Sequence, residues 1–464
     1  MNCRFWPYAT VLLSALAGFT ACSSSNAPTA GTKVDGVGEP RVVVSIQDSA
    51  FNPYHDFFYA GSPIYADAPP SSVTPEVLAE FGIAPEQQIQ LTRTGNIAAD
   101  IQADQTFWKS VKLGQTYWFK GTNLIARSAC VDDFPLLVPD AGKSAHGVGV
   151  SAAALRANPE AVLYLIEICN SGTAEAQEAA TLHPAVDLMS ISVAISVGAV
   201  MTPLPVFFIG TYEGVVGLGK LQFHAAGNNP NFTPIQPGPG AWWTIGVSGI
   251  EEHHSHGQPI QSANAPDFVS NFTAELPYCM DCETGLSLHS GTSYSSPHAA
   301  GVASRVLLEA RRALGHRGGI VTAADGRPAL IAAGDTIVTN WDLRRALEEA
   351  AYVGYTIADY DPTANSGVTP LITVPVLAVP INDAAPWLQL GWGDLSADPD
   401  KQVVAEALAQ LGLGTPTRFK AAGFCEHQSA LMRFRQAYWG AASAGLHAPR
   451  ANTYQFCDSA LPLP

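Results

Sequence analysis

Three side chains in well-separated parts of the chain have the chemistry of nucleophilic catalysis. Ser293 lies in the stretch GTSYSSPHAAG, where a small-residue helix is expected to begin, and Ala and Gly flank His146 at the start of another such helix. Asp48 comes two residues after an apolar run at residues 41–46. A serine hydroxyl is a weak nucleophile until a base takes its proton, and an imidazole base works best when a carboxylate orients it. These residue types predict a catalytic aspartate, histidine and serine.

Each of these residues also has a commoner structural role. A serine ahead of a helix is usually a helix cap, and an aspartate after a strand usually forms a turn. The chain has 12 histidines, and what favours His146 among them is its glycine-flanked position at a helix start. His298 is expected to be structural. The functional hypothesis therefore depends on elements that bring the three residues together.

Apolar strands and Ala-rich helices alternate along the chain. Helical spacing is found at residues 151–161 and 172–182. This alternation predicts an α/β fold with a doubly wound, mostly parallel sheet flanked by helices. Functional side chains of such sheets gather at the carboxyl ends of the strands, where Asp48 is expected to lie. The predicted strands are the apolar runs at residues 41–46, 162–168, 186–193, 221–227 and 242–249.

The segments around the three residues resemble those of a known family. GTSYSSPHAAG resembles the active-serine signature of subtilisin-like serine proteases (subtilases, peptidase family S8), and VSIQDSAFNPYH and AHGVGVSAA are similar to the family's aspartate and histidine segments. The order Asp48, His146, Ser293 is also the family's order. HAAGNNP is similar to the segment that supplies an oxyanion-hole asparagine, which implies that role for Asn228. VDLMSISVA is similar to the family's substrate-binding strand, which implies that role for Ser192, Val193 and Ala194.

The resemblance covers about residues 41–413 and implies a subtilisin-like catalytic domain. The implied activity is that of a serine endopeptidase working through an acyl-enzyme intermediate, with a protein or peptide as substrate. Ala50, Val148 and Ala194 stand where the family usually has glycine, threonine and glycine. These departures leave a second hypothesis, a catalytically weak subtilase-like protein that binds peptides or a surface partner at the same cleft.

An α/β-hydrolase esterase is a third, disfavoured hypothesis. The nucleophile segment reads GTSYS rather than the GxSxG of such esterases, and His146 precedes Ser293 instead of following it.

Composition and charge limit the class of protein and of partner. The chain has 464 residues, 47% of them hydrophobic and 14% charged, which favours a large globular protein. The net charge of −16 and the lack of basic patches argue against a nucleic-acid partner, and a monomer is expected. Residues 56–143, rich in Pro and aromatic residues, are predicted to be an insertion in the catalytic domain, and residues 414–464 a C-terminal extension.

The N-terminus has the pattern of an export signal. Residues 1–21 are predicted to be a signal peptide, since their apolar stretch is too short to span a bilayer, and residues 22–40 a flexible tether. FTAC around Cys22 resembles a bacterial lipoprotein cleavage box, although Phe19 is uncommon there and ordinary signal cleavage is the alternative. We therefore expect an exported, extracytoplasmic protein whose one membrane contact would be a lipid on Cys22, at the outer membrane or cell surface.

Six of the eight cysteines lie in the predicted mature protein, where export favours disulfides. Cys279 and Cys282 in YCMDC are expected to form a disulfide or buried thiols, because a structural zinc site normally needs four ligands and the chain has no second CxxC. The oxygen-rich stretch at residues 359–367 is expected to be a loop, which leaves calcium open, and no cofactor is required. Metal binding is likewise not expected at His253, His254 and His256.

Overall fold

The computed structural model describes part of the chain, and all of that part belongs to one compact unit, Lys33–Pro464. The predictions for the signal peptide, Cys22, the histidine cluster at 253–256, residues 359–367, Val193 and Ala194, and nearly all of the tether and the C-terminal extension lie outside the described residues. Within the described part, no helix has both the length and the apolar character needed to cross a bilayer. The described residues are 39–65, 71–130, 136–168, 174–192, 210–228, 243–250, 259–261, 268–350, 352–353, 388–389 and 400–415.

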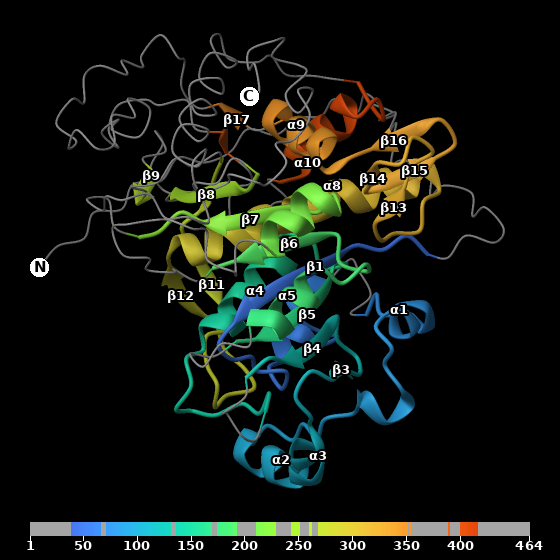
Figure 1. The fold of residues 1–464 in the computed structure, drawn as a ribbon. Coiled ribbons are helices and arrows are strands. Elements are labelled where there is room, and N and C mark those ends of the chain that lie inside the picture. Colours follow the sequence, from blue (N-terminus) through green and yellow to red (C-terminus); the bar gives the residue numbers. More distant parts are fainter. Residues whose placement is uncertain are drawn as a thin grey trace, which may run out of the picture. The chain divides into compact units, whose positions relative to one another are not determined.

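Among the described residues, a twelve-stranded sheet forms the centre of this unit. In sheet order its strands are β17 (Tyr352–Val353), β18 (Leu388–Gln389), β10 (Phe268–Asn271), β8 (Ile245–Ile250), β7 (Leu221–Ala225), β6 (Leu188–Ile191), β1 (Val43–Asp48), β5 (Val162–Glu167), β4 (Leu124–Ser128), β3 (Thr116–Phe119) and β2 (Gln88–Ile89), with β9 (Pro259–Gln261) paired to β8. Figure 1 shows this order from β8 to β3. The five predicted apolar runs form β1, β5, β6, β7 and β8.

The sheet is mostly parallel, as predicted. Each of the neighbours from β18 through β4 runs parallel to the next, and antiparallel pairing is confined to β17 with β18, β9 with β8, and β3 with β4. Every residue of β1 and of β5 is buried. A strand covered on both faces has no solvent side, which explains why these stretches are almost continuously apolar.

Helices cover both faces of the sheet. Val44 and Ile46 of β1 belong to a core that includes residues of helices α4 (His146–Ala157), α8 (Thr292–Leu314), α9 (Asn340–Ala350) and α10 (Asp400–Gln410). Val43 belongs to a second core, which includes residues of α1 (Pro75–Glu80) and α5 (Ala174–Thr181). Successive side chains of a strand point to opposite faces, so these two cores lie on opposite sides of β1. The predicted doubly wound arrangement is confirmed.

The segment at residues 56–143 extends one side of the sheet. It contributes β2, β3 and β4, and β4 pairs in parallel with β5. The segment also contains helices α2 (Ile97–Ala103) and α3 (Gln105–Ser110). Trp108 of α3 lies beside Tyr54, whose hydroxyl accepts a hydrogen bond from the indole N–H at 2.9 Å. Aromatic packing thus joins the segment to the chain that follows β1.

Smaller elements complete the described part. Short helical turns lie at Asp56–Phe58, Pro63–Tyr65, Pro85–Gln87 and Glu213–Gly217. Three two-stranded ribbons pair β11 (Thr273–Leu276) with β12 (Ser287–Ser290), β13 (Val321–Thr322) with β14 (Pro328–Ala329), and β15 (Ile331–Ala333) with β16 (Thr336–Val338).

Candidate active site

The carboxyl edge of the central strands gathers most of the predicted site residues. Asp48 is the last residue of β1, Ser192 directly follows β6, and Asn228 follows β7. β1 lies between β5 and β6: β5, β4, β3 and β2 follow on one side of it, and β6, β7, β8, β10, β18 and β17 on the other. This is the kind of switch point at which open α/β sheets place their functional groups.

Asp48 and His146 are in direct contact. His146 Nδ1 lies 2.7 Å from Asp48 Oδ2, and the carboxylate is 2% exposed. The other oxygen, Oδ1, accepts a hydrogen bond from the Ser49 amide at 2.8 Å. Gly147 makes the contact sterically feasible, because a Cβ at this position would lie 2.2 Å from the Ala50 carbonyl oxygen and 2.9 Å from Asp48 Cβ. The glycine after His146 therefore lets helix α4 reach the end of β1.

The electrostatics of this pair suit a proton acceptor. Burial alone lowers the pKa of His146, but the hydrogen bond that His146 donates to Asp48 and the negative charge of that carboxylate raise it overall above the ordinary value of 6.5. In the neutral imidazole, Nδ1–H donates to the carboxylate, which leaves the Nε2 lone pair to accept a proton. His146 can thus take a proton at Nε2 while Asp48 stabilises the resulting cation.

Ser293 is the second residue of helix α8 and not its cap. Gly291 is the N-cap, with φ 156° and ψ 150°, a conformation that only glycine adopts readily. Ser293 itself is half-buried, and its Oγ lies 3.5 Å from the Ser192 carbonyl oxygen. The capping role that a serine usually has at a helix start is therefore taken by another residue, and the Ser293 hydroxyl remains available.

Pro297 explains the link between Ser293 and Ser192. It lies inside α8 and has no N–H, so the carbonyl of Ser293 lacks its usual partner four residues later. The hydroxyl of Ser192 donates to that carbonyl instead, at 2.8 Å. The end of β6 is thereby fixed against the first turn of α8.

Asn228 is oriented by the residue next to Ser293. Its Oδ1 accepts hydrogen bonds from the amide of Thr292 at 2.8 Å and from the Thr292 hydroxyl at 2.9 Å. With Oδ1 held, Nδ2 lies near Gly291, at 3.3 Å from where a Cβ of that residue would be. Nδ2 makes no hydrogen bond within the described residues, so a donor remains available close to Ser293.

Close packing of two helices brings His146 toward Ser293. A Cβ on Gly301 of α8 would lie 2.4 Å from the Ala154 carbonyl oxygen of α4, so only glycine permits this approach. The ring of His146 lies 5.8 Å, centroid to centroid, from the ring of Tyr294, the residue after Ser293. Between His146 and Ser293 themselves, both of which are described, the structure has no hydrogen bond. Such bonds are often long or absent until substrate binds.

Sequence reasoning missed an aromatic cluster beside His146. Tyr278 stacks on His289 at 3.6 Å, and both rings lie edge-on to Tyr294 at 6.3 Å. The sequence feature that could have revealed this cluster is Tyr278 directly before CMDC, together with His289 and Tyr294 on either side of GTS. His298, expected to be structural, is buried, and its Nδ1 lies 2.6 Å from the Ser270 hydroxyl.

No protein-family model matches the chain, and no curated protein is detectably similar in sequence. Among solved structures, the PatG macrocyclase in complex with peptide is 12% identical, with 81% of this chain and 93% of that chain covered at a TM-score of 0.41. The prenylagaramide maturation protease PagA is also 12% identical, with 68% and 86% covered at 0.39. Fervidolysin from Fervidobacterium pennivorans, a keratinolytic enzyme related to subtilisin, is 13% identical, with 68% and 40% covered at 0.38. These likenesses are distant, so the case for function rests on the side chains of the site.

Proposed function

We propose that the protein is a subtilisin-like serine endopeptidase. The observation that carries the proposal is the 2.7 Å contact between His146 Nδ1 and the buried carboxylate of Asp48, at the carboxyl edge where Ser192 and Asn228 also lie. The helix that begins at Thr292 presents Ser293 beside these groups. A carboxylate that orients an imidazole, together with an alcohol at the same site, is the machinery of acyl transfer.

In the proposed reaction, Ser293 Oγ attacks a peptide carbonyl carbon while His146 Nε2 takes the hydroxyl proton. Asp48 accepts a hydrogen bond from Nδ1–H and stabilises the imidazolium. The negative charge that forms on the carbonyl oxygen receives hydrogen bonds from the Ser293 amide and from Asn228 Nδ2, a donor of a kind worth roughly 3–4 kcal/mol of barrier.

The imidazolium then returns the proton to the leaving amine. Water hydrolyses the resulting acyl-enzyme by the same proton path in reverse, with His146 again the base. Ser192, Val193 and Ala194 are proposed to lie along the substrate backbone, supported for Ser192 by its hydrogen bond to the Ser293 carbonyl at 2.8 Å.

A serine-directed probe tests this proposal. We expect a fluorophosphonate to label the wild type and to leave Ser293→Ala unlabelled, with peptide turnover reduced by about a millionfold. Ser290→Ala, three residues away on the exposed strand β12, is the matched control and should be labelled like the wild type. Labelling of a folded Ser293→Ala variant would show that the nucleophile is another residue.

A catalytically weak, peptide-binding protein is the second candidate. It is favoured by one observation: the Ser293 hydroxyl lies 3.5 Å from the Ser192 carbonyl oxygen, and it makes no hydrogen bond to His146 within the described residues. A folded protein that binds peptides at this edge, ignores the probe and cleaves no casein would identify this function instead of the first.

Cellular location is proposed from the N-terminal sequence alone. We infer that the protein is exported, that residues 1–21 are removed, and that Cys22 carries the lipid of a bacterial lipoprotein. Metabolic labelling with an alkyne fatty acid should mark the wild type and not Cys22→Ser. Export without lipid on the wild type would point to ordinary signal cleavage.

A further inference from the structure

The ribbon that leads to Ser293 carries a disulfide at its tip. β11 and β12 pair in antiparallel fashion, and β12 ends at Ser290, directly before the N-cap of helix α8. In the turn between the two strands a disulfide joins Cys279 and Cys282, whose Cα atoms are 5.8 Å apart. Any change in this turn can reach Ser293 through a short length of chain.

The chain that follows Asp48 holds the same turn through one buried amide. Asn52 Nδ2 donates to the carbonyl of Cys279 at 3.1 Å and to the carbonyl of Cys282 at 2.8 Å. Asn52 is 1% exposed and lies four residues after Asp48. The side chain of Asn52 therefore donates hydrogen bonds to both ends of the CxxC turn. It can do so only while the two carbonyl groups keep a fixed separation.

Neighbouring residues reinforce this connection. The amide of Asp56 donates to the Glu283 carbonyl at 2.7 Å, and Nε2 of the buried His55 donates to the Gly285 carbonyl at 3.0 Å. All of these hydrogen bonds join residues 52–56 to residues 279–285. The turn and the chain after Asp48 thus form one hydrogen-bonded layer.

The turn also contacts the candidate base. Tyr278, next to Cys279, lies edge-on to Tyr294, and Tyr294 lies beside His146. A Cβ on Gly149 of helix α4 would lie 3.1 Å from the Tyr278 ring and 3.0 Å from the Tyr294 ring, so α4 packs directly against both. The CxxC turn therefore meets the segments that carry all three proposed catalytic residues.

The chemistry at the turn favours a disulfide over a metal. A ring nitrogen of His55 and the sulfurs of Cys279 and Cys282 lie within 4.8 Å of one another, as three metal ligands could. Both nitrogens of His55 already have partners, since Nδ1 accepts from the Phe57 amide at 3.1 Å and Nε2 donates to Gly285. Burial and the nearby Arg93 lower the pKa of His55 to about 4, so the ring is neutral and has no lone pair left for a metal.

We propose that the Cys279–Cys282 disulfide is a thiol-sensitive clamp that positions the catalytic residues, with Asn52 as its positioning residue; this inference rests on the proposed function. Both cysteines are half-buried and the neighbouring Asp281 is exposed, so a small thiol has access. A dithiol reductant would transfer two electrons and two protons, breaking the S–S bond to give two thiols while the reductant becomes a disulfide.

Reduction frees the two carbonyls to separate, and Asn52 can then hold only one of them. The chain after Asp48 and the strand β12 that leads to Ser293 are then no longer held together by Asn52. Small misplacements of reacting groups have large effects on rate. Global stability should change little, because a disulfide that closes so short a loop removes little entropy from the unfolded chain.

The test compares oxidised and reduced full-length protein. We expect dithiothreitol to lower kcat by about 10- to 100-fold, with KM changed less than about twofold and Tm lowered by no more than about 4 °C, and reoxidation to restore kcat. Alkylation and peptide mapping verify that Cys279 and Cys282 have reacted. Cys279→Ser/Cys282→Ser controls for the other cysteines, since it should match the reduced wild type and ignore dithiothreitol.

Asn52→Asp separates positioning from loss of packing, because it keeps the shape of the side chain and removes both donors. We expect it to lower kcat as reduction does and to make reduction nearly without further effect. Asn96→Asp is the matched control, since Asn96 caps α2 through its Oδ1, which an aspartate also provides.

The outcomes distinguish the clamp from the proposed function. Unchanged kcat in a protein whose Cys279 and Cys282 are both alkylated overturns the clamp and leaves the endopeptidase intact. Failure of the oxidised wild type to react with the fluorophosphonate overturns the endopeptidase itself. Faster amide hydrogen exchange at residues 48–56 on reduction, which needs no activity to be seen, is expected from the clamp and its absence would contradict it.

Discussion

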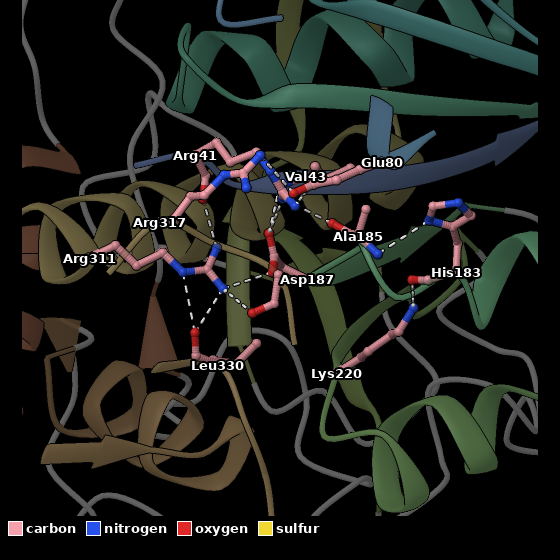
Figure 2. Close-up of polar contacts among 11 residues, drawn as sticks. Arg41, Val43, Glu80, His183, Ala185, Asp187, Lys220, Arg311, Arg317 and Leu330 are labelled. Carbon is pink, nitrogen blue, oxygen red and sulfur yellow. Dashed lines mark hydrogen bonds and ion pairs between the residues drawn. The ribbon is translucent and has the colours of Figure 1, made fainter. Parts of the chain in front are cut away.

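At the amino ends of β1, β6 and β7 the protein buries a fixed network of ion pairs, whereas at the carboxyl ends of the same strands some polar groups of the candidate site are partly or fully exposed. Figure 2 shows the first region, in which Asp187 is fully buried between Arg311 and Arg41, with Oδ1 2.8 Å from a nitrogen of Arg311 and Oδ2 3.7 Å from a nitrogen of Arg41. In the second region the side chain of His146 is 25% exposed, and Ser293 is half-buried.

The same elements contribute to both regions. At one end each carries a buried charge, and at the other a residue of the candidate site. The network therefore stabilises the strands and the helix that carry the site without touching the site itself. The pairs are Arg41, just before β1, and Asp48 at its end; Asp187 and Ser192, on either side of β6; Lys220 and Asn228, before and after β7; and Arg311 and Ser293, both in α8.

The buried carboxylates of the two regions, Asp187 and Asp48, differ in the role of their charge. Burial alone would raise the pKa of Asp187, but Arg311 and Arg41 keep it below its ordinary value, so the group stays ionised and permanently paired. Asp48 instead pairs with a histidine whose proton must move. A permanent charge suits a scaffold, and a titratable partner suits proton transfer.

The largest expected effect comes from removing the charge at the carboxyl end. Asp48→Asn keeps the size of the side chain but no longer orients the base or stabilises the imidazolium, so we expect kcat/KM to fall by about 10⁴. Steady-state peptide hydrolysis measures this change, and urea unfolding should show a free energy of unfolding within about 1 kcal/mol of the wild type. A loss smaller than tenfold would remove Asp48 from the mechanism.

The matching change at the amino end should affect stability instead. Asp187→Asn leaves Arg311 buried without its carboxylate, and we expect the free energy of unfolding to fall by about 3–5 kcal/mol. The fraction that remains folded should keep the wild-type turnover per active site, counted by probe labelling. Asp325→Asn is the control, since its pair with Arg327 is exposed and contributes little to stability. Equal effects of the two substitutions would contradict the distinction between the regions.

The candidate site was easier to predict from sequence than the network that supports it. Asp48, His146 and Ser293 each lie in a short segment with its own signature, so residues within about ten positions identify them. Asp187 and Arg311 are 124 residues apart, and neither neighbourhood hints at the other. Such partners are brought together only by tertiary packing, which a local sequence pattern does not reveal.

The same physical reason separates the elements that were predicted from those that were not. β1 and β5 are buried on both faces, and burial leaves a run of apolar residues that is visible in the sequence. β3 lies next to the edge strand β2, two of its residues, Thr116 and Trp118, are only half-buried, and its sequence gives a weaker signal. The contact of Asn52 with the CxxC turn spans 227 residues and has no local signature at all.

Lowering the pH should affect the two regions differently, with a smaller effect than the two substitutions have. Despite its burial, the pKa of His146 is raised above 6.5 by Asp48, and a protonated imidazole cannot take the proton of Ser293. We therefore expect kcat/KM to fall reversibly as the pH drops through that raised value. A pH–rate profile measures this acid limb.

At the amino ends, burial lowers the pKa of His183 and of His316 to about 4. Between about pH 6.5 and pH 4 these two histidines bind protons in the unfolded chain but not in the folded chain. The free energy of unfolding is therefore not reduced by them above pH 6.5, and it declines as the pH falls toward 4. The contribution of His146 has the opposite sign, because its raised pKa stabilises the folded state below pH 6.5 and the effect is lost as the pH rises through the raised pKa. Activity should therefore disappear at a higher pH than the circular dichroism signal of the folded sheet. Loss of both signals over one pH range, without recovery on neutralisation, would mean that unfolding and not protonation of His146 sets the acid limb.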